Sequence, residues 1–249
     1  MAGGEIRSNT DTGLLKIVAC VCMVIDHVGL EFFSGTPWYT PMRAVGRVAF
    51  PIFAYCMAVG CRYTRNIGLY ALRLLLLGIL VQPLYMPAMK HVPIGAFDWG
   101  SNFYRLDKIY DFFFSGRLNI LFSLTAGVLI LWTLRDKKYI LTALVCLGCY
   151  LIESRLDYGL KGLLLMVLFY AFLDRPITSL VWVGLLMVHW GMPSLFGQWN
   201  TRHVLQIYAL TALPLIYAPI HTRLRLNKFF FYAFYPGHLL VIYLIQRFM

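Results

Sequence analysis

The sequence predicts an all-α integral membrane protein, a polytopic bundle of about nine transmembrane helices. Three properties predict this class: hydrophobic residues make up 60 % of the 249 residues, charged residues make up 13 %, and the mean hydropathy is +0.69. A soluble domain normally has about 25 % charged residues and about 45–50 % apolar ones. The composition therefore excludes a water-soluble enzyme or binding module, and it also excludes a disordered chain.

Mainly apolar segments follow one another along the whole chain, and several of them are short. They cover residues 13–34, 44–61, 68–87, 118–134, 139–153, 158–173, 177–192, 203–220 and 229–247. Strands are not expected, because these runs are too long and do not alternate polar with apolar residues. No repeat and no second domain is visible, so we expect a single integral-membrane domain over residues 1–249.

The net charge of +11 reflects 22 Lys and Arg residues against 11 Asp and Glu residues. The basic residues form short clusters between apolar segments, which favours the positive-inside bias of membrane proteins over nucleic-acid binding. With a cytoplasmic N-terminus, about twelve basic residues lie inside and about eight outside, Arg43 among the latter. We therefore expect a multi-pass protein of the inner (cytoplasmic) membrane. The first residues do not have the pattern of a removable signal peptide.

The six cysteines lie within or at the edge of apolar segments. Cys146 and Cys149 have C-x-x-C spacing, but no second pair accompanies them, so we expect packing residues and neither a disulfide nor a metal site. The longest connection covers residues 88–117 and is rich in aromatic side chains. Such a segment is typical either of a functional loop or of a surface-lying element that caps the bundle.

Ionisable residues inside predicted spans are the first candidates for function, because they are costly to place in lipid. Asp26 and His27 lie within the first segment, Arg47 lies near the start of the second, and Tyr235 and His238 lie in the last. Adjacent residues on a helix point about 100° apart, so Asp26 does not face His27. An unpaired carboxylate would be unfavourable there, and we expect an ion pair between Asp26 and Arg47.

Lys16 and His27 share one stripe of the first predicted helix. The eleven positions between them turn through about 1100°, within about 20° of three full turns, and rise about 16 Å. This stripe suits a long anionic donor that enters from the cytoplasm, with its phosphates near Lys16 and Lys228 and its reactive end at His27. A buried imidazole stays neutral near pH 7, so His27 is a candidate general base.

Two other functions are compatible with the same residue types. Asp26, His27, Arg47 and Lys161 are typical of a proton pathway in a small ion-coupled transporter, although the paired halves of such transporters are not visible. A buried aspartate and histidine can also be purely structural, with hydrogen bonds between helices, in a non-catalytic assembly protein.

Five blocks of sequence, in order along the chain, resemble the motifs of the TraX family. They are KIVACVCMVIDHVGL, GRVAFPIFAY, NILFSL, YGLKGLLL and FYPGHLLVIYLI. The resemblance implies an integral membrane acyltransferase that moves an acetyl group from acetyl-CoA to an amine or hydroxyl acceptor, such as a pilin N-terminus or a cell-surface glycan or peptide. The family is also similar in organisation to the wider membrane acyltransferases, which share a basic residue three helical turns before a histidine of the first helix.

The resemblance assigns residues of this chain to the family motifs. They are Asp26, His27, Gly46, Arg47, Phe50, Pro51, Asn119, Tyr158, Gly159, Tyr235 and His238. The catalytic set that follows is His27, Asp26, Arg47 and His238, and the donor-binding set is Lys16, Arg47, Asn119, Tyr235 and Lys228. The expected partners are acetyl-CoA, the acceptor and the lipid bilayer, without nucleic acid or metal. The sequence does not predict the oligomeric state.

Overall fold

The computed structural model describes residues 11–90, 116–192, 205–218, 222, 224 and 227–249. These residues form helices and turns, and no strand occurs among them, as predicted. They pack as two compact units, each made of two stretches of chain: unit 1 is Met1–Arg65 with Lys161–Leu226, and unit 2 is Asn66–Leu160 with Asn227–Met249. The expectation of a single domain over residues 1–249 stays a prediction.

Four helices are long and apolar enough to cross a membrane. They are Gly13–Phe32, Tyr39–Tyr63, Ile67–Ala88 and Phe229–Phe248. Shorter apolar helices cover Ile120–Arg135, Tyr139–Leu151, Gly159–Ala171, Pro176–Gly191 and Leu205–Tyr217. Each predicted apolar segment therefore contains a helix within the described residues. The helical membrane character is confirmed, whereas the number of spans and the cytoplasmic N-terminus stay predictions.

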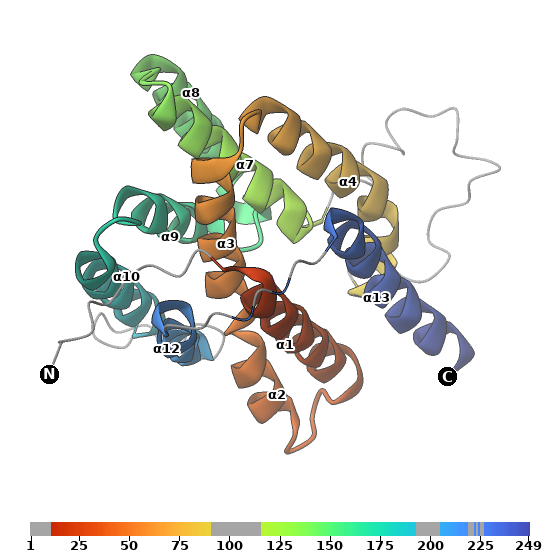
Figure 1. The fold of residues 1–249 in the computed structure, drawn as a ribbon. Coiled ribbons are helices and arrows are strands. Elements are labelled where there is room, and N and C mark those ends of the chain that lie inside the picture. Colours follow the sequence, from red (N-terminus) through yellow and green to blue (C-terminus); the bar gives the residue numbers. More distant parts are fainter. Residues whose placement is uncertain (1–10, 91–115, 193–204, 219–221, 223, 225–226) are drawn as a thin grey trace, which may run out of the picture. The chain divides into compact units, whose positions relative to one another are not determined.

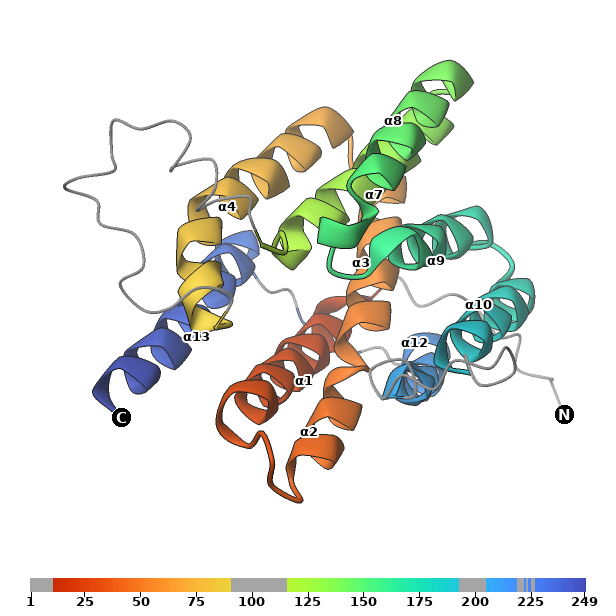
Figure 2. The same ribbon diagram turned by 180° about the vertical axis from the view of Figure 1, so that it is seen from behind.

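Unit 1 is centred on one buried helix, α3 (Ala49–Tyr63). α1 (Gly13–Phe32) packs against α3 and against α2 (Tyr39–Gly46), as both views show (Figure 1 and Figure 2). The unit also contains α9 (Gly159–Ala171), α10 (Pro176–Gly191), η3 (Leu205–Thr211) and α12 (Ala212–Tyr217). A helix that is apolar on all sides becomes the core of its bundle, and α3 has this composition.

Aromatic contacts hold the centre of unit 1 together. Tyr55 of α3 is only 1 % exposed, and its ring meets Phe169 of α9 and Tyr217 of α12 edge-on, at centroid distances of 5.3 and 6.4 Å. The Tyr217 hydroxyl donates a hydrogen bond of 2.6 Å to the hydroxyl oxygen of Ser179 on α10. The phenol of Tyr217 is thereby satisfied inside an apolar bundle, as a buried polar group has to be.

The helix predicted over residues 44–61 begins earlier than expected. α2 starts at Tyr39, and after a turn at Arg47 and Val48 the chain continues as α3. Arg43, expected above in an outer connection, is therefore a helical residue, and this part of the prediction was wrong. The polar residues Thr40 and Arg43 end the apolar run without ending the helix, because Arg43 finds an internal partner on α1.

Unit 2 is organised by α4 (Ile67–Ala88), which packs against α7 (Ile120–Arg135) and α13 (Lys228–Phe248). α8 (Tyr139–Leu151) packs against α7, and the short helix η1 (Glu153–Arg155) follows it. α4 and α7 approach closely at Gly78, where a Cβ would lie 3.3 Å from the Leu121 Cβ. The Gln246 amide of α13 donates to the Ala88 carbonyl oxygen (3.1 Å), which satisfies one of the last carbonyls of α4.

Large apolar side chains are exposed on several helices, most extensively on α8. Ile140 is 83 % exposed, Leu151 is 73 % exposed, and Leu80 of α4 is 74 % exposed. Lipid tails are as apolar as leucine, so such surfaces are favourable in a bilayer and unfavourable in water. The six cysteines are free thiols; five of them are buried as packing residues, whereas Cys146 is exposed. The first ten residues and most of the aromatic connection (91–115) lie outside the described residues.

Replacing Gly191 with alanine tests the packing of α10 against η3. A Cβ at Gly191 would lie 2.7 Å from the Ile207 backbone nitrogen, so Gly191→Ala forces two backbones apart. We expect it to lower the free energy of unfolding by about 1–3 kcal/mol in detergent micelles. The matched change Gly184→Ala, where the nearest atom is Leu213 Cδ1 at 3.9 Å, should be neutral or slightly stabilising. Equal effects of the two changes would contradict this packing.

Candidate functional site

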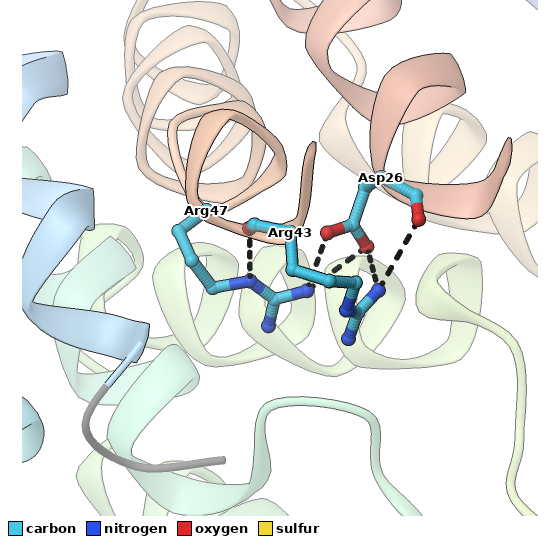
Figure 3. A network of polar contacts seen from close by, with 3 residues as sticks. All are labelled: Asp26, Arg43 and Arg47. Carbon is cyan, nitrogen blue, oxygen red and sulfur yellow. Dashed lines mark hydrogen bonds and ion pairs between the residues drawn. The ribbon is translucent and has the colours of Figure 1, made fainter. Parts of the chain in front are cut away.

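The most connected polar group in unit 1 is the carboxylate of Asp26, which α1 presents to α2. Arg47 donates from Nη2 to both carboxylate oxygens at 2.9 Å. Arg43 donates from Nη1 to Oδ2 at 2.5 Å and to the Asp26 carbonyl oxygen at 3.4 Å. Figure 3 shows the two guanidinium groups side by side against one carboxylate. The predicted pair of Asp26 with Arg47 is present, and Arg43 is a second partner.

The three side chains of this cluster are largely buried. Their exposed fractions are 11 % for Asp26, 13 % for Arg47 and 16 % for Arg43. A buried ion pair offsets the desolvation of its charges only when the geometry is good, and loss of one member leaves an uncompensated charge. Two arginines on one aspartate also give these three side chains a net charge of +1. The cluster therefore fixes α1 to α2 and concentrates positive charge in an apolar region.

Two glycines allow α1 and α2 to come close enough for these contacts. A Cβ at Gly46 of α2 would overlap the Asp26 carboxylate, and a Cβ at Gly29 of α1 would lie 2.6 Å from the Met42 Cβ. Gly29 is three residues after Asp26 and Gly46 is four after Met42, so each pair shares a helical face. The absence of a side chain at Gly46 is thus a condition for the ion pairs.

His27 lies on another face of α1 than Asp26, because adjacent residues of a regular helix point about 100° apart. α1 runs without interruption from Gly13 to Phe32, so Lys16 and His27 stay on one stripe, about 20° apart around the helix axis. Both side chains are half-buried. Cys20 and Met23, which lie between them on this stripe, are 4 % and 9 % exposed. The stripe is therefore packed inside the protein along much of its length.

Two residues of this region were missed by the sequence analysis, Arg43 and Glu31. Glu31 is 6 % exposed on α1, four residues after His27 and therefore on the same helical face. Arg43 lies four residues before Arg47 on the same face as that residue. Both residues lie four positions from a candidate that the sequence had already indicated, Glu31 from His27 and Arg43 from Arg47. This spacing places each of them on the same helical face as that candidate. It was overlooked because Arg43 was placed in a connection and Glu31 at the end of a span.

In unit 2, Asn119 is fully buried and joins α4 to α7. Its side-chain amide donates to the Gly78 carbonyl oxygen and to Gln82 Oε1, both at 2.8 Å. Its Oδ1 accepts from the Leu121 backbone N–H (3.0 Å) and caps α7. Both amide hydrogens are engaged in these bonds, so the geometry favours a structural role. The assignment of Asn119 to donor binding stays a prediction.

Tyr235 and His238 also lie in unit 2, on α13. The His238 side chain is buried, and its Nδ1 lies 3.1 Å from the Phe234 carbonyl oxygen. A carbonyl oxygen only accepts, so the proton of this bond is on Nδ1. The imidazole also stacks on Phe234, at a centroid distance of 5.6 Å. The Tyr235 hydroxyl is buried without a hydrogen-bond partner in the described part of the chain.

The predicted site residues are thus divided between the two units. Unit 1 holds Lys16, Asp26, His27 and Arg47, whereas unit 2 holds Asn119, Tyr235 and His238. Lys228 is the first residue of α13, after the N-cap Asn227. The structure brings Asp26 and Arg47 together, and it keeps Lys16 and His27 on one helix. Their catalytic and donor-binding roles stay predictions.

Replacing Asp26 with asparagine measures the strength of the buried ion pairs. Asp26→Asn keeps the shape of the side chain but leaves two buried guanidinium groups without a counter-charge. We expect a loss of about 3–5 kcal/mol in the free energy of unfolding, or failure to fold. The matched change Asp174→Asn removes the exposed pair with Arg62 (3.0 Å) and should be worth less than about 1 kcal/mol. Comparable losses in chemical denaturation would show that the Asp26 cluster is not a structural anchor.

A double-mutant cycle tests whether Gly46 acts through Asp26. Alone, Gly46→Ala should destabilise the protein by about 3 kcal/mol, because the new methyl group overlaps the carboxylate. Combined with Asp26→Gly, which removes all three overlapped atoms (Oδ1, Cγ and Cβ), the Gly46→Ala change should lower the unfolding free energy by less than about 1 kcal/mol. Additive effects of the two changes on the unfolding free energy would show that Gly46 has another function.

Comparisons with known proteins cover nearly the whole chain. A family model described as TraX protein matches residues 11–246. The probable fimbrial assembly protein FimC, serogroup H1, of Dichelobacter nodosus is 26 % identical over 251 residues, which cover 94 % of this chain and 95 % of that protein. An uncharacterised protein of Rickettsia prowazekii (strain Madrid E) is 29 % identical over 139 residues, 54 % of this chain and 53 % of that protein. No solved structure has significant similarity to the chain.

The family match includes α1 with Asp26 and His27, the α2–α3 region with Arg47, and α13 with His238. The sequence blocks that resembled this family are therefore part of one continuous match. This chain belongs to the TraX family.

Proposed function

We propose that this protein is an acyltransferase of the inner membrane that moves an acetyl group from cytoplasmic acetyl-CoA to an amine or hydroxyl acceptor. A pilin N-terminus or a cell-surface glycan or peptide has the required chemistry. The proposal is carried by one observation: a half-buried histidine and a half-buried lysine share a stripe of α1, about 16 Å apart along the helix axis. The separate Asp26 cluster fixes that helix to α2.

In the proposed reaction, His27 accepts the proton of the acceptor amine or hydroxyl as its nitrogen or oxygen attacks the thioester carbonyl carbon. A bond forms between the acceptor and the acetyl carbon, the carbon–sulfur bond breaks, and the CoA thiolate takes up the proton from His27. Lys16 attracts the phosphates of the donor, about 16 Å from His27 along the helix axis. Arg47 pairs with Asp26 and holds α1 against the α2–α3 region.

Glu31 extends the proposed site by one residue. A general base is most effective when a third group fixes its orientation, as a carboxylate does for the histidine of a catalytic triad. Glu31 is buried and lies one helical turn after His27 on the same face. We assign it as a positioning residue for the imidazole of His27. The catalytic role expected of His238 and the donor-binding role expected of Tyr235, both in unit 2, stay predictions.

A second candidate function is a non-catalytic role in the assembly of a surface fibre. The observation in its favour is the name of the Dichelobacter nodosus relative, a probable fimbrial assembly protein that aligns with almost the entire chain. In this alternative, the Asp26 cluster and the α1 stripe are structural, and their charges are satisfied within the bundle. The two candidates differ in whether the α1 histidine is needed after the protein has folded.

Replacing His27 with glutamine separates the two candidates. The full-length protein in detergent micelles is given radiolabelled acetyl-CoA with a peptide that has a free amino terminus, or with a polysaccharide that has free hydroxyl groups. We expect His27→Gln to lower the rate of label transfer by about 10²–10⁴-fold, because the general base is lost. Binding of CoA, measured by calorimetry, should remain within about twofold, because Lys16 is unchanged.

The matched control is His189→Gln, which changes an exposed histidine of α10 in the same unit. It should leave both the transfer rate and CoA binding near the wild-type values. If His27→Gln keeps a near-normal transfer rate, His27 is not the base. If the wild type neither cleaves nor transfers from acetyl-CoA and His27→Gln still supports fibre assembly in cells, the assembly role is the correct one.

A further inference from the structure

One edge of the Arg43 guanidinium group has no partner. Arg43 uses Nη1 for both of its hydrogen bonds to Asp26. Its Nε is buried and bonds to no acceptor in the described part of the chain. Nη2 shares with Nε the edge of the guanidinium that presents two parallel N–H bonds. A buried N–H group without an acceptor is unfavourable by about 1–3 kcal/mol. A ligand with an acceptor atom at this edge would remove that cost.

The local charge favours an anion at this edge. Asp26 supplies one negative charge against the two positive charges of Arg43 and Arg47. Figure 3 shows that one terminal nitrogen of each guanidinium points away from Asp26, toward the same side of the cluster. The Arg43 side chain keeps 16 % of its surface exposed, although its Nε is buried, so a ligand would have to approach this edge from the Nη2 side.

We propose that the Nε/Nη2 edge of Arg43 is a binding site for an oxyanion, a carboxylate or a phosphate group. Both groups place two oxygen atoms at the spacing of two parallel N–H bonds, and the resulting paired hydrogen bonds are charge-assisted. The second arginine adds long-range attraction, while Asp26 holds Arg43 in place from its other side. The site does not require acyl transfer, because binding alone satisfies the N–H groups and the net charge.

The oxyanion can come from a soluble molecule or from a lipid headgroup, and two experimental arms separate these sources. In detergent micelles, the full-length protein is titrated with sodium acetate or sodium phosphate against sodium chloride at constant ionic strength, and its melting temperature is followed. In lipid nanodiscs, the melting temperature in phosphatidylglycerol is compared with that in phosphatidylcholine. A saturating rise in the first arm identifies a soluble oxyanion, and a rise only with phosphatidylglycerol identifies a lipid headgroup.

Arg43→Lys is the decisive variant, because it keeps the positive charge beside Asp26 but removes the two-nitrogen edge. We expect it to raise the concentration of anion needed for half of the effect by about tenfold or more. The control Arg62→Lys changes an arginine of the same unit that forms an exposed ion pair with Asp174, and it should bind as the wild type does. If no anion gives a saturating rise, or if Arg43→Lys responds as the wild type does, the proposal is wrong.

A second measurement needs only the wild type and covers the case in which Arg43→Lys does not fold. Phenylglyoxal modifies accessible arginines, and mass spectrometry reports the rate at each one. The anion that stabilises the protein should slow the modification of Arg43 several-fold and leave that of Arg62 unchanged. Equal modification rates at Arg43 with and without the anion would overturn the assignment of the site.

Discussion

The packing of the first two helices depends on one carboxylate that two arginines share in an apolar environment. In water such an ion pair contributes little, but at the low dielectric of a bundle interior an unpaired charge is strongly unfavourable. The ion pairs among Asp26, Arg43 and Arg47 therefore contribute strongly to the packing of α1 against α2. These ion pairs also require glycine at position 46, because a side chain there would occupy the space of the Asp26 carboxylate.

Asp26 and His27 therefore lie on two different faces of α1. The Asp26 face binds α2, whereas the stripe of Lys16, Cys20, Met23 and His27 is rotated away from it, by about 100° at His27. A base that also formed part of an ion-pair network would change its partners whenever it gained or lost a proton. Under the proposed function, this separation would let His27 exchange a proton without breaking the ion pairs of Asp26.

Much of this fold is encoded in composition and spacing, and the exceptions have identifiable causes. The apolar runs predict the helices to within a few residues, because hydropathy alone separates membrane helices from their connections. The start of α2 was missed, since Arg43 appears too polar for a span until its partner Asp26 is known. The pair of Asp26 with Arg47 was predictable, because a buried carboxylate requires a cation. The structural role of Asn119 was not, since its partners Gly78 and Gln82 are distant in sequence.

The buried polar groups of the two units differ in how completely their hydrogen bonds are satisfied. Asn119 in unit 2 donates from its amide to two acceptors on the neighbouring helix α4, so its amide donors are satisfied within the unit. Arg43 in unit 1 has one edge engaged by Asp26 and one edge without an acceptor among the described residues. Both groups are buried, and only the second is charged. A buried arginine with a partner on one edge only is held rigidly and remains able to bind, which is what recognition of an anion in an apolar bundle requires.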